Sequence, residues 1–196
     1  NAQPQAQWLT SFDAVPERRC LAGRTWEWDG VRFEMLHPHP QHFDESGKGR
    51  LSTNAMSCVL LVSAGPHSAW LGGDIDSNQE VRMALARPEL RATLMLAPHH
   101  GSRTSSSPVL LNTLRPRWVI AQSGYRNRFN HPSPIVLKRY RQRRIPWVTS
   151  AQCGAATWQS MRPDEVACHR EAARRFWHHP AETQEDPEGD DPYLPH

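Results

Sequence analysis

The stretch Leu94–Ser107, LMLAPHHGSRTSSS, decides how the rest of the chain is interpreted. Its apolar start predicts a buried strand, and the Gly and Ser residues after it predict the loop that leaves the strand. His99 and His100 stand at that junction, where α/β folds place their chemistry. Neutral imidazole is a common metal ligand, so the pair predicts metal ligands, with a hydrogen-bonded strand end as the alternative.

Two more expected strand ends carry similar side chains. The run WLGGDID (70–76) ends an apolar strand at Asp74, and NRFNHP (127–132) places His131 after a strand expected at 117–122. One carboxylate and three imidazoles at consecutive strand ends form a fragment of a metal site, without the regular spacing of a zinc finger.

Strands and helices alternate along the chain, which predicts the α/β class. The run RTWEWDGVRFEML (24–36) predicts a two-residue hairpin, and residues 37–53 predict a loop. Further strands are expected at 57–63, 68–71, 93–97, 117–122, 146–150 and 155–159, helices at 77–86, 108–114 and 134–143, and either a helix or an edge strand at 166–178. We expect a linker or remnant at 1–18, one domain at 19–179 and a disordered acidic tail at 180–196.

The charge is unevenly distributed. Of 20 Asp and Glu residues six lie in the last fifteen positions, whereas residues 90–163 contain twelve basic residues and no acidic one. Such a stretch predicts binding to a polyanion such as nucleic acid, with ordinary solvated helix faces as the alternative. The candidates are Arg115, Arg117, Arg126, Arg128, Lys138, Arg139, Arg141, Arg143 and Arg144, with Trp118, Tyr125 and Phe129 for base stacking or, more commonly, core packing.

Several short motifs follow one another in a fixed order. They are SCVLLV (57–62), GDI (73–75) with Glu80, PHHGS (98–102) with TSS (104–106), SG (123–124) with Asn127, HP (131–132) and GA (154–155). In this order they resemble the C-terminal metallo-β-lactamase-like domain of the ComEC family of competence DNA-uptake channel proteins. The resemblance covers about residues 20–160; His-His-Gly-Ser is fairly specific, whereas Gly-Asp alone is weak.

This resemblance implies a fold, an activity and a place in the cell. The fold would be the C-terminal part of an αββα sandwich. The activity would be DNA uptake in natural transformation, as a metal-dependent nuclease that degrades the non-transported strand. The implied partners are single- or double-stranded DNA, the membrane channel of the same parent protein and other competence proteins. The parent would lie in the cytoplasmic membrane, with this domain on the extracytoplasmic side, and no apolar run here approaches the ~18–20 residues that span a bilayer.

The resemblance also implies roles for single residues. Asp74, His99, His100 and His131 are the catalytic candidates. Asp74 would bridge two divalent ions, manganese or zinc. One of His99 and His100, with His99 preferred, would be a ligand, and the other would orient it. His131 would be a ligand or would polarise the scissile phosphate. Such an ion pair activates water for an in-line phosphodiester displacement. DNA contacts are expected from Ser102, Thr104, Ser105, Asn127, Arg126, Arg128, Lys138, Arg139 and Arg141, although the hydroxyls serve equally well as loop and helix caps.

One motif of metallo-β-lactamase folds is missing. The early His-x-(His/Asp)-x-Asp-His pattern is absent, since the early histidines His37, His39, His42 and His67 do not form it. We therefore expect a piece of a longer domain that lacks its N-terminal half, has an incomplete metal site and shows little or no activity alone. The alternatives are a non-catalytic DNA-binding or gating module of the channel, which the missing motif favours, and a small-molecule metallo-hydrolase, which the basic stretch disfavours.

The four cysteines Cys20, Cys58, Cys153 and Cys168 form no C-x-x-C motif, which argues against a zinc knuckle or a thioredoxin-type site. The extracytoplasmic placement implied by the resemblance allows the pairs Cys20–Cys58 and Cys153–Cys168. Buried free thiols are the alternative of equal weight.

Overall fold

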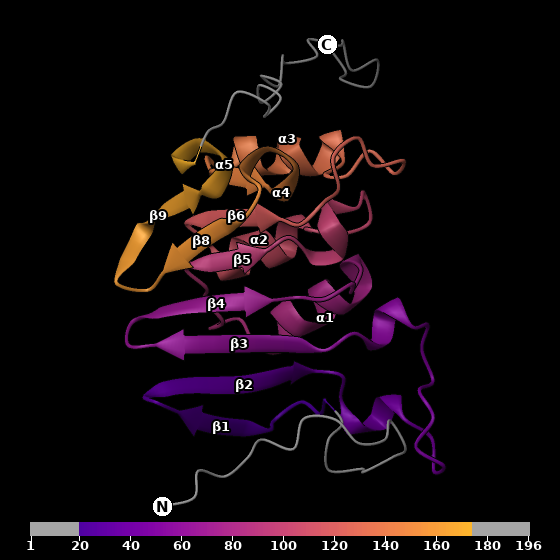
Figure 1. Cartoon of the computed structure of the whole chain (residues 1–196). Coiled ribbons are helices and arrows are strands. Elements are labelled where there is room, and N and C mark those ends of the chain that lie inside the picture. The colour runs from indigo at the N-terminus through magenta and orange to yellow at the C-terminus, as the bar shows by residue number, and fades with distance from the viewer. Residues whose placement is uncertain (1–19, 174–196) are drawn as a thin grey trace, which may run out of the picture.

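The structure is a computed structural model that describes residues 20–173. Its main feature is a sheet of seven strands that lie side by side in chain order (Figure 1). The strands are β1 (Thr25–Trp28), β2 (Val31–His37), β3 (Val59–Ala64), β4 (His67–Leu71), β5 (Leu94–Leu96), β6 (Trp118–Ala121) and β7 (Trp147–Thr149). The expected linker at 1–18 and the acidic tail lie outside the described residues.

The first four strands are antiparallel. Trp28 pairs with Val31, so Asp29 and Gly30 alone connect β1 to β2. Both have positive φ, 51° and 74°, as the favoured hairpin turn requires. The predicted hairpin is therefore confirmed, as are the two strands joined by Gly65 and Pro66.

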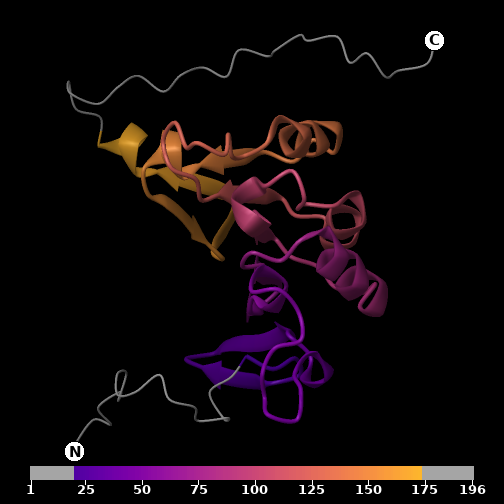
Figure 2. The same ribbon diagram turned by 90° about the vertical axis from the view of Figure 1, so that its right-hand side faces the viewer.

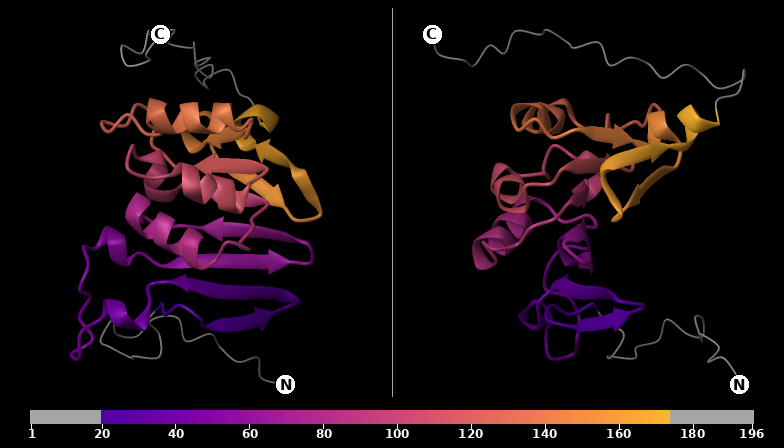
Figure 3. Two further views of the ribbon diagram at one scale, coloured as in Figure 1. Left: turned by 180° about the vertical axis from the view of Figure 1, so that it is seen from behind. Right: turned by 90° about the vertical axis from the view of Figure 1, so that its left-hand side faces the viewer.

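Strands β4 to β7 are parallel, and a helix connects each to the next. These helices are α1 (Ser77–Ala86), α2 (Pro108–Leu114) and α3 (Pro134–Gln142), and they cover one face of the sheet (Figure 3). Each begins where the sequence predicts it, because Asp76 and Ser107 cap the first turns of α1 and α2 and proline opens α2 and α3. The α/β class is confirmed.

The core fills the space between these helices and the sheet. From the strands it takes Trp70, Met95 and Val119, which have no exposed surface. Neighbouring strands present these three side chains to the same face, because Met95 pairs with both Trp70 and Val119. The helices contribute the rest of this layer, including Met83, Leu110, Leu111, Leu114, Val136 and Tyr140.

A smaller unit lies on the other side of the sheet, beside β5–β7 (Figure 3). It contains the hairpin of β8 (Ala156–Gln159) and β9 (Arg162–Cys168), with the short helices α4 (Ser150–Cys153) and α5 (His169–Ala172). The disulfide Cys153–Cys168 joins α4 to the end of β9. The sequence did not predict α4, which is a single turn capped by Thr149, or the start of β9 at Arg162.

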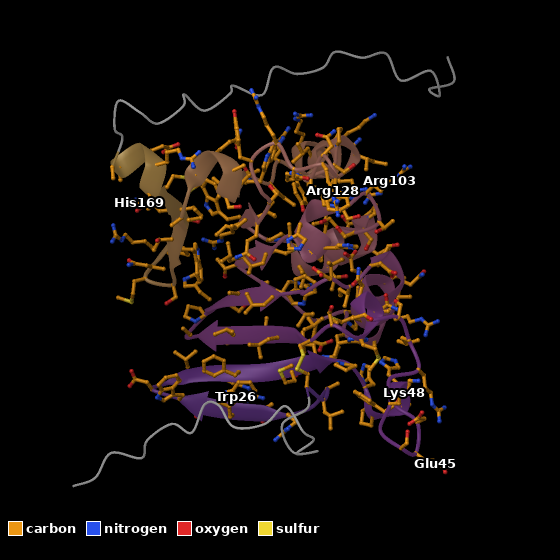
Figure 4. The ribbon with its side chains drawn as sticks, turned by 45° about the vertical axis from the view of Figure 1, so that its right-hand side comes forward. Trp26, Glu45, Lys48, Arg103, Arg128 and His169 are labelled. Carbon is orange, nitrogen blue, oxygen red and sulfur yellow. A yellow bond between two sulfur atoms is a disulfide. The ribbon has the colours of Figure 1, made fainter. Side chains whose placement is uncertain are left out.

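No described element covers the corresponding face of β1–β4, which is apolar. Register places Trp26, Phe33, Val62 and Ala69 in one row across these strands. Trp26 stacks on Phe33 at 5.0 Å and is 44% exposed; Figure 4 shows it at the edge of the sheet. In the described residues, helices therefore cover one face of the seven-stranded sheet, and its other face is uncovered at β1–β4 (Figure 3). None of the described helices is long and apolar enough to cross a membrane.

Candidate functional site

The expected site residues meet at one edge of the sheet. Parallel strands end on the same side, so the loops after β4, β5 and β6 emerge together (Figure 2). Strand β2 runs in the same direction as β4, because both are antiparallel to β3. The segment 38–58 that follows β2 therefore reaches the same edge.

Backbone hydrogen bonds hold these loops against one another. The amide of His99 donates to Gly73 O at 2.9 Å, and the amide of Ser77 donates to Thr104 O at 2.7 Å. On the other side, Ser133 N donates to Gly101 O at 2.8 Å. The sequence neighbours of Asp74, His100 and His131 are thus fixed to each other.

The histidine loop has an unusual backbone. His99, His100 and Gly101 follow one another with φ of 49°, 58° and 80°. For a non-glycine residue this left-handed region costs of order 1–3 kcal/mol and persists only where the surroundings enforce it. Gly101 is also tightly enclosed, because an added Cβ would lie 2.7 Å from Cβ of Pro132.

His100 faces Asp74. Its Nε2 lies 3.5 Å from Asp74 Oδ1, and its Nδ1 lies 2.8 Å from Gln122 O. The carbonyl can only accept, so Nδ1 carries a proton, and the ring is held with Nε2 facing the carboxylate. Metal-bound histidines typically donate their other ring N–H to a carbonyl in this way.

His99 and His131 lie beside this pair, with their ring centroids 6.2 Å apart. The Nδ1 atoms of both rings are buried without a hydrogen-bond partner. Burial is the main cause that lowers the pKa of His131, and the neighbouring His99 and His100 lower it further. His131 is therefore neutral at physiological pH, which is the form that a metal ligand requires.

These donors fit part of a divalent-metal site. A carboxylate, an oriented imidazole and two buried ring nitrogens without partners are suitable ligands. Within residues 20–173, however, no three His, Cys, Asp or Glu side chains are close enough together to hold an ion as they stand. The metal roles of Asp74, His99 and His131 stay predictions.

The hydroxyls of the loop mainly hold its shape. Ser105 is fully buried and donates to Pro98 O at 2.7 Å, and Ser102 Oγ lies 3.2 Å from Thr104 Oγ1. These contacts agree with the capping alternative rather than with a phosphate contact for Ser105.

The buried carboxylate of Glu80 holds the end of the histidine loop by hydrogen bonds. Both oxygens of Glu80 accept backbone hydrogen bonds, from Ser106 N at 2.7 Å and from Ser107 N at 2.6 Å. Burial raises the pKa of Glu80, while these hydrogen bonds and nearby Arg139 oppose that shift. Arg139 itself donates to Ser105 O at 2.7 Å, so this guanidinium is engaged within the protein.

The loop after β6 carries exposed aromatic and basic side chains. Tyr125 and Phe129 are 51% and 62% exposed, and the guanidinium of Arg128 lies 4.7 Å from the Phe129 ring centroid. Arg128 and Arg103 project at the same corner of the molecule (Figure 4). Asn127 stabilises this loop, since its carboxamide bonds His131 N at 2.9 Å and His131 O at 2.7 Å.

The other predicted DNA contacts are more scattered. Arg117 pairs with Asp164 at 2.8 Å, and Arg143 donates to Asn112 Oδ1 at 2.9 Å. Lys138 and Arg141 lie exposed on α3, where Arg141 also lies 5.6 Å from the Trp147 ring centroid. Trp118 is half-buried in β6.

Sequence reasoning missed two partners of the histidines. Gln122 contributes only a backbone carbonyl, which no side-chain pattern reveals. Asn54 lies in a single 3-10 turn (Asn54–Met56), where its Nδ2 is 3.3 Å from His99 Nε2. Its only signal is a polar residue shortly before an apolar strand, which is too common to be informative.

The geometry defines a mixed α/β domain whose aspartate and histidine loops meet at one sheet edge. No protein-family model matches the chain. It is 37% identical over 139 residues to "Competence protein ComA" of Neisseria gonorrhoeae, covering 70% of this chain and 19% of that protein. "Recombination protein 2" of Haemophilus influenzae is 36% identical over 61% of the chain and 14% of that protein, and "ComE operon protein 3" of Bacillus subtilis is 29% identical over 66% and 16%.

The chain thus spans less than a fifth of the length of these three relatives. It is related to the ComEC-type competence proteins, which confirms that part of the resemblance found in the sequence. The likeness to the metallo-β-lactamase fold stays a prediction.

Proposed function

We propose that the chain is a DNA-processing segment of a competence DNA-uptake protein, in which Asp74 and the neighbouring histidines support metal-dependent phosphodiester hydrolysis. One observation carries this proposal: three consecutive strand-end loops bring a carboxylate and three imidazoles together at one sheet edge. The named relatives support the biological setting. DNA, the channel of the same parent and other competence proteins are the proposed partners.

The chain's own residues have distinct parts in this proposal. Asp74, His100 and His131, with His99 beside them, would hold manganese or zinc. The metal supplies positive charge for the phosphodiester oxygens during displacement. Gln122 O orients the His100 ring so that Nε2 faces Asp74, and burial lowers the pKa of His131, which favours the neutral ring.

The missing ligands would come from another part of the parent protein. The apolar face of β1–β4 that no described element covers (Figure 3) supports this view, because an apolar sheet face commonly packs against a second layer. We propose that this second layer completes an αββα sandwich. Both disulfides support an oxidising, extracytoplasmic location.

A non-catalytic DNA-binding module is the second candidate. The observation in its favour is that the described donors do not converge on one ion. Exposed Arg126 beside Tyr125 and exposed Arg128 beside Phe129 suit nucleic acid without requiring any metal.

Metal and activity measurements on the parent protein separate the two candidates. Asp74→Ala should lose bound metal and DNA degradation together, whereas Ser102→Ala should lose only about tenfold in activity, since one hydrogen bond is worth about 0.5–1.5 kcal/mol. The chain alone should turn over well below ~1 per second. Full metal content and normal degradation in Asp74→Ala would reject the metal site and leave the binding module.

Both proposed functions require DNA binding by the exposed aromatic and basic side chains of the loop after β6. Measuring DNA binding by the chain alone tests this surface. Affinity for a single-stranded oligonucleotide should fall with salt at a log–log slope of roughly −0.7 per neutralised phosphate. Arg128→Gln should weaken binding and reduce the slope, and Arg117→Gln, which removes an ion-paired side chain, is the matched control. A flat salt profile would reject the surface.

A further inference from the structure

Residues 182–191 form an acidic segment that follows the described residues in the sequence. No Lys or Arg occurs from residue 182 to residue 196. The acidic side chains of the segment are Glu182, Glu185, Asp186, Glu188, Asp190 and Asp191. Such a run of like charges attracts cationic surfaces, as a nucleic acid does. Any ion pair of this segment therefore needs a partner from another part of a protein.

A basic surface among the described residues offers such a partner. We define it by four exposed residues, Arg126 and Arg128 in the loop after β6 and Lys138 and Arg141 on α3. Lys138 and Arg141 are three positions apart, so they lie on the same side of the helix. No Asp or Glu occurs within residues 90–163. The stretch of chain that carries the basic surface therefore has no carboxylate side chains of its own.

The described chain ends at the same end of the molecule as α3. The last described helix, α5, lies with α3 and α4 at the end formed by the edge strand β7 (Figures 1 and 3). Arg170 fastens α5 to α4, since its guanidinium donates to Ala151 O at 2.6 Å. The acidic segment thus follows from a fixed point near the basic helix.

The acidic segment is also long enough to reach the basic surface. An extended chain spans about 3.3–3.6 Å per residue, so Glu182 can lie up to about 30 Å and Asp191 up to about 60 Å from residue 173. The radius of gyration of a domain of this size is about 15 Å. The basic surface therefore lies within reach of all six carboxylates.

We propose that the acidic segment binds the basic surface of its own chain and competes with DNA for it. Charge complementarity carries the proposal, because six carboxylates without cations meet a surface with cations and no carboxylates in its own stretch of chain. The contact itself does not depend on the proposed function, and only the competition with DNA rests on it.

The consequence of this contact is a weaker affinity for short DNA. A segment tethered to its binding surface has an effective concentration of about 1 mM. A non-specific polyanion contact has a dissociation constant of about 0.1 mM at physiological salt. Competition should therefore lower the affinity for a short oligonucleotide about tenfold, and this reduction should fade as salt rises, because salt screens the contact.

Carbodiimide cross-linking of the full chain tests the contact without DNA or metal. The reagent joins a carboxylate to a lysine amine as an amide and takes up the water that this condensation releases. The chain contains two lysines, Lys138 on the basic surface and Lys48 in the loop between β2 and β3, which lies toward the other end of the molecule from Arg128 (Figure 4). Lys48 is therefore an internal control.

Peptide mapping should find residues 182–191 joined to Lys138 and much less to Lys48. Equal yields at the two lysines, or no product at Lys138, would overturn the proposal. Addition of a single-stranded oligonucleotide should suppress the Lys138 product. A product that persists while the oligonucleotide is bound would reject the competition with DNA.

Two variants of the full chain, each lacking three exposed carboxylates, test the competition by DNA binding. The segment variant carries Glu185→Gln, Asp186→Asn and Glu188→Gln, and the control variant carries Glu27→Gln, Glu45→Gln and Glu165→Gln. The segment variant should bind a short single-stranded oligonucleotide about threefold more tightly than the wild type at ~50 mM salt, and the control variant should bind as the wild type does.

Equal gains in the two variants would attribute the effect to net charge and reject the competition. Absence of DNA binding in all three proteins would reject the proposed function and the competition together. The cross-linking result would then still decide whether the acidic segment binds the basic surface, so the two failures remain distinguishable.

Discussion

The antiparallel half of the sheet, β1–β4, and the parallel half, β4–β7, are built in different ways. The antiparallel half has short turns and one open face, and its far loop is attached by a disulfide. The parallel half has helices between its strands, and its strand-end loops are fixed by backbone hydrogen bonds.

Non-glycine residues with positive φ, which strain the backbone, are also distributed unequally between the two halves. Among the described non-glycine residues with positive φ, Asp29 alone belongs to the antiparallel half, where it forms a hairpin turn. His99, His100, Ser106, Arg126 and Asn130 all lie in the loops at the candidate site. The parallel half therefore determines the positions of the donors, while Asn54, in the loop between β2 and β3, contacts one of them.

Among these changes, removing the buried Glu80 carboxylate should lower the free energy of unfolding the most. Glu80→Ala leaves two buried amides, Ser106 N and Ser107 N, without acceptors and should lower the free energy of unfolding by about 3–5 kcal/mol. Urea denaturation measures it, with exposed Glu27→Gln in the antiparallel half as the control. A loss below about 1 kcal/mol would show that the parallel half does not depend on this support.

One disulfide belongs to the antiparallel half, and the other belongs to the smaller unit of β8 and β9 that follows the parallel half. They close loops with sequence separations of 38 and 15 residues, for which chain entropy gives about 4 and about 3 kcal/mol of stabilisation. Cys20→Ser/Cys58→Ser should therefore destabilise slightly more than Cys153→Ser/Cys168→Ser in urea denaturation. The reverse order would mean that native packing, not loop length, sets the contribution of each bridge.

Gly101 in the parallel half and Gly23 in the antiparallel half have similar φ but different surroundings. Gly101→Ala combines φ of +80° with a contact of 2.7 Å to Pro132 Cβ and should cost about 3 kcal/mol. Gly23→Ala has φ of +90° but nothing within 4 Å, so it should cost about 1 kcal/mol. Equal losses in thermal unfolding would show that the site loop yields to accommodate a methyl group.

The smallest expected effect is the contribution of His37, in the antiparallel half, to the pH dependence of the melting temperature. Burial lowers the pKa of His37 below 6.5, so folding favours the neutral ring. This contribution is present above pH 6.5 and is lost as pH falls toward the lowered pKa, because the unfolded chain binds the proton more readily. Melting temperatures at pH 7.5 and pH 5.5 should differ less for His37→Gln than for the wild type; an identical difference would contradict this.

The sequence predicted the regular elements because local signals determine them. The DG turn, the Asp76 and Ser107 caps and the prolines of α2 and α3 each act within a few residues. It could not predict the orientation of the histidines, since their partners Gln122 and Asn54 are 22 and 45 residues away in the chain. The same holds for the start of β9 at Arg162, where the polar residues up to Glu165 carry no strand pattern.

The left-handed conformation of His99 and His100 has a consequence for anyone who engineers this protein. Glycine or asparagine would fit both positions with less strain, so a search for thermal stability will favour replacing them. Such a search would delete two side chains of the candidate site while it improved the melting temperature. These two positions must therefore be held constant, because stability and chemistry select different residues there.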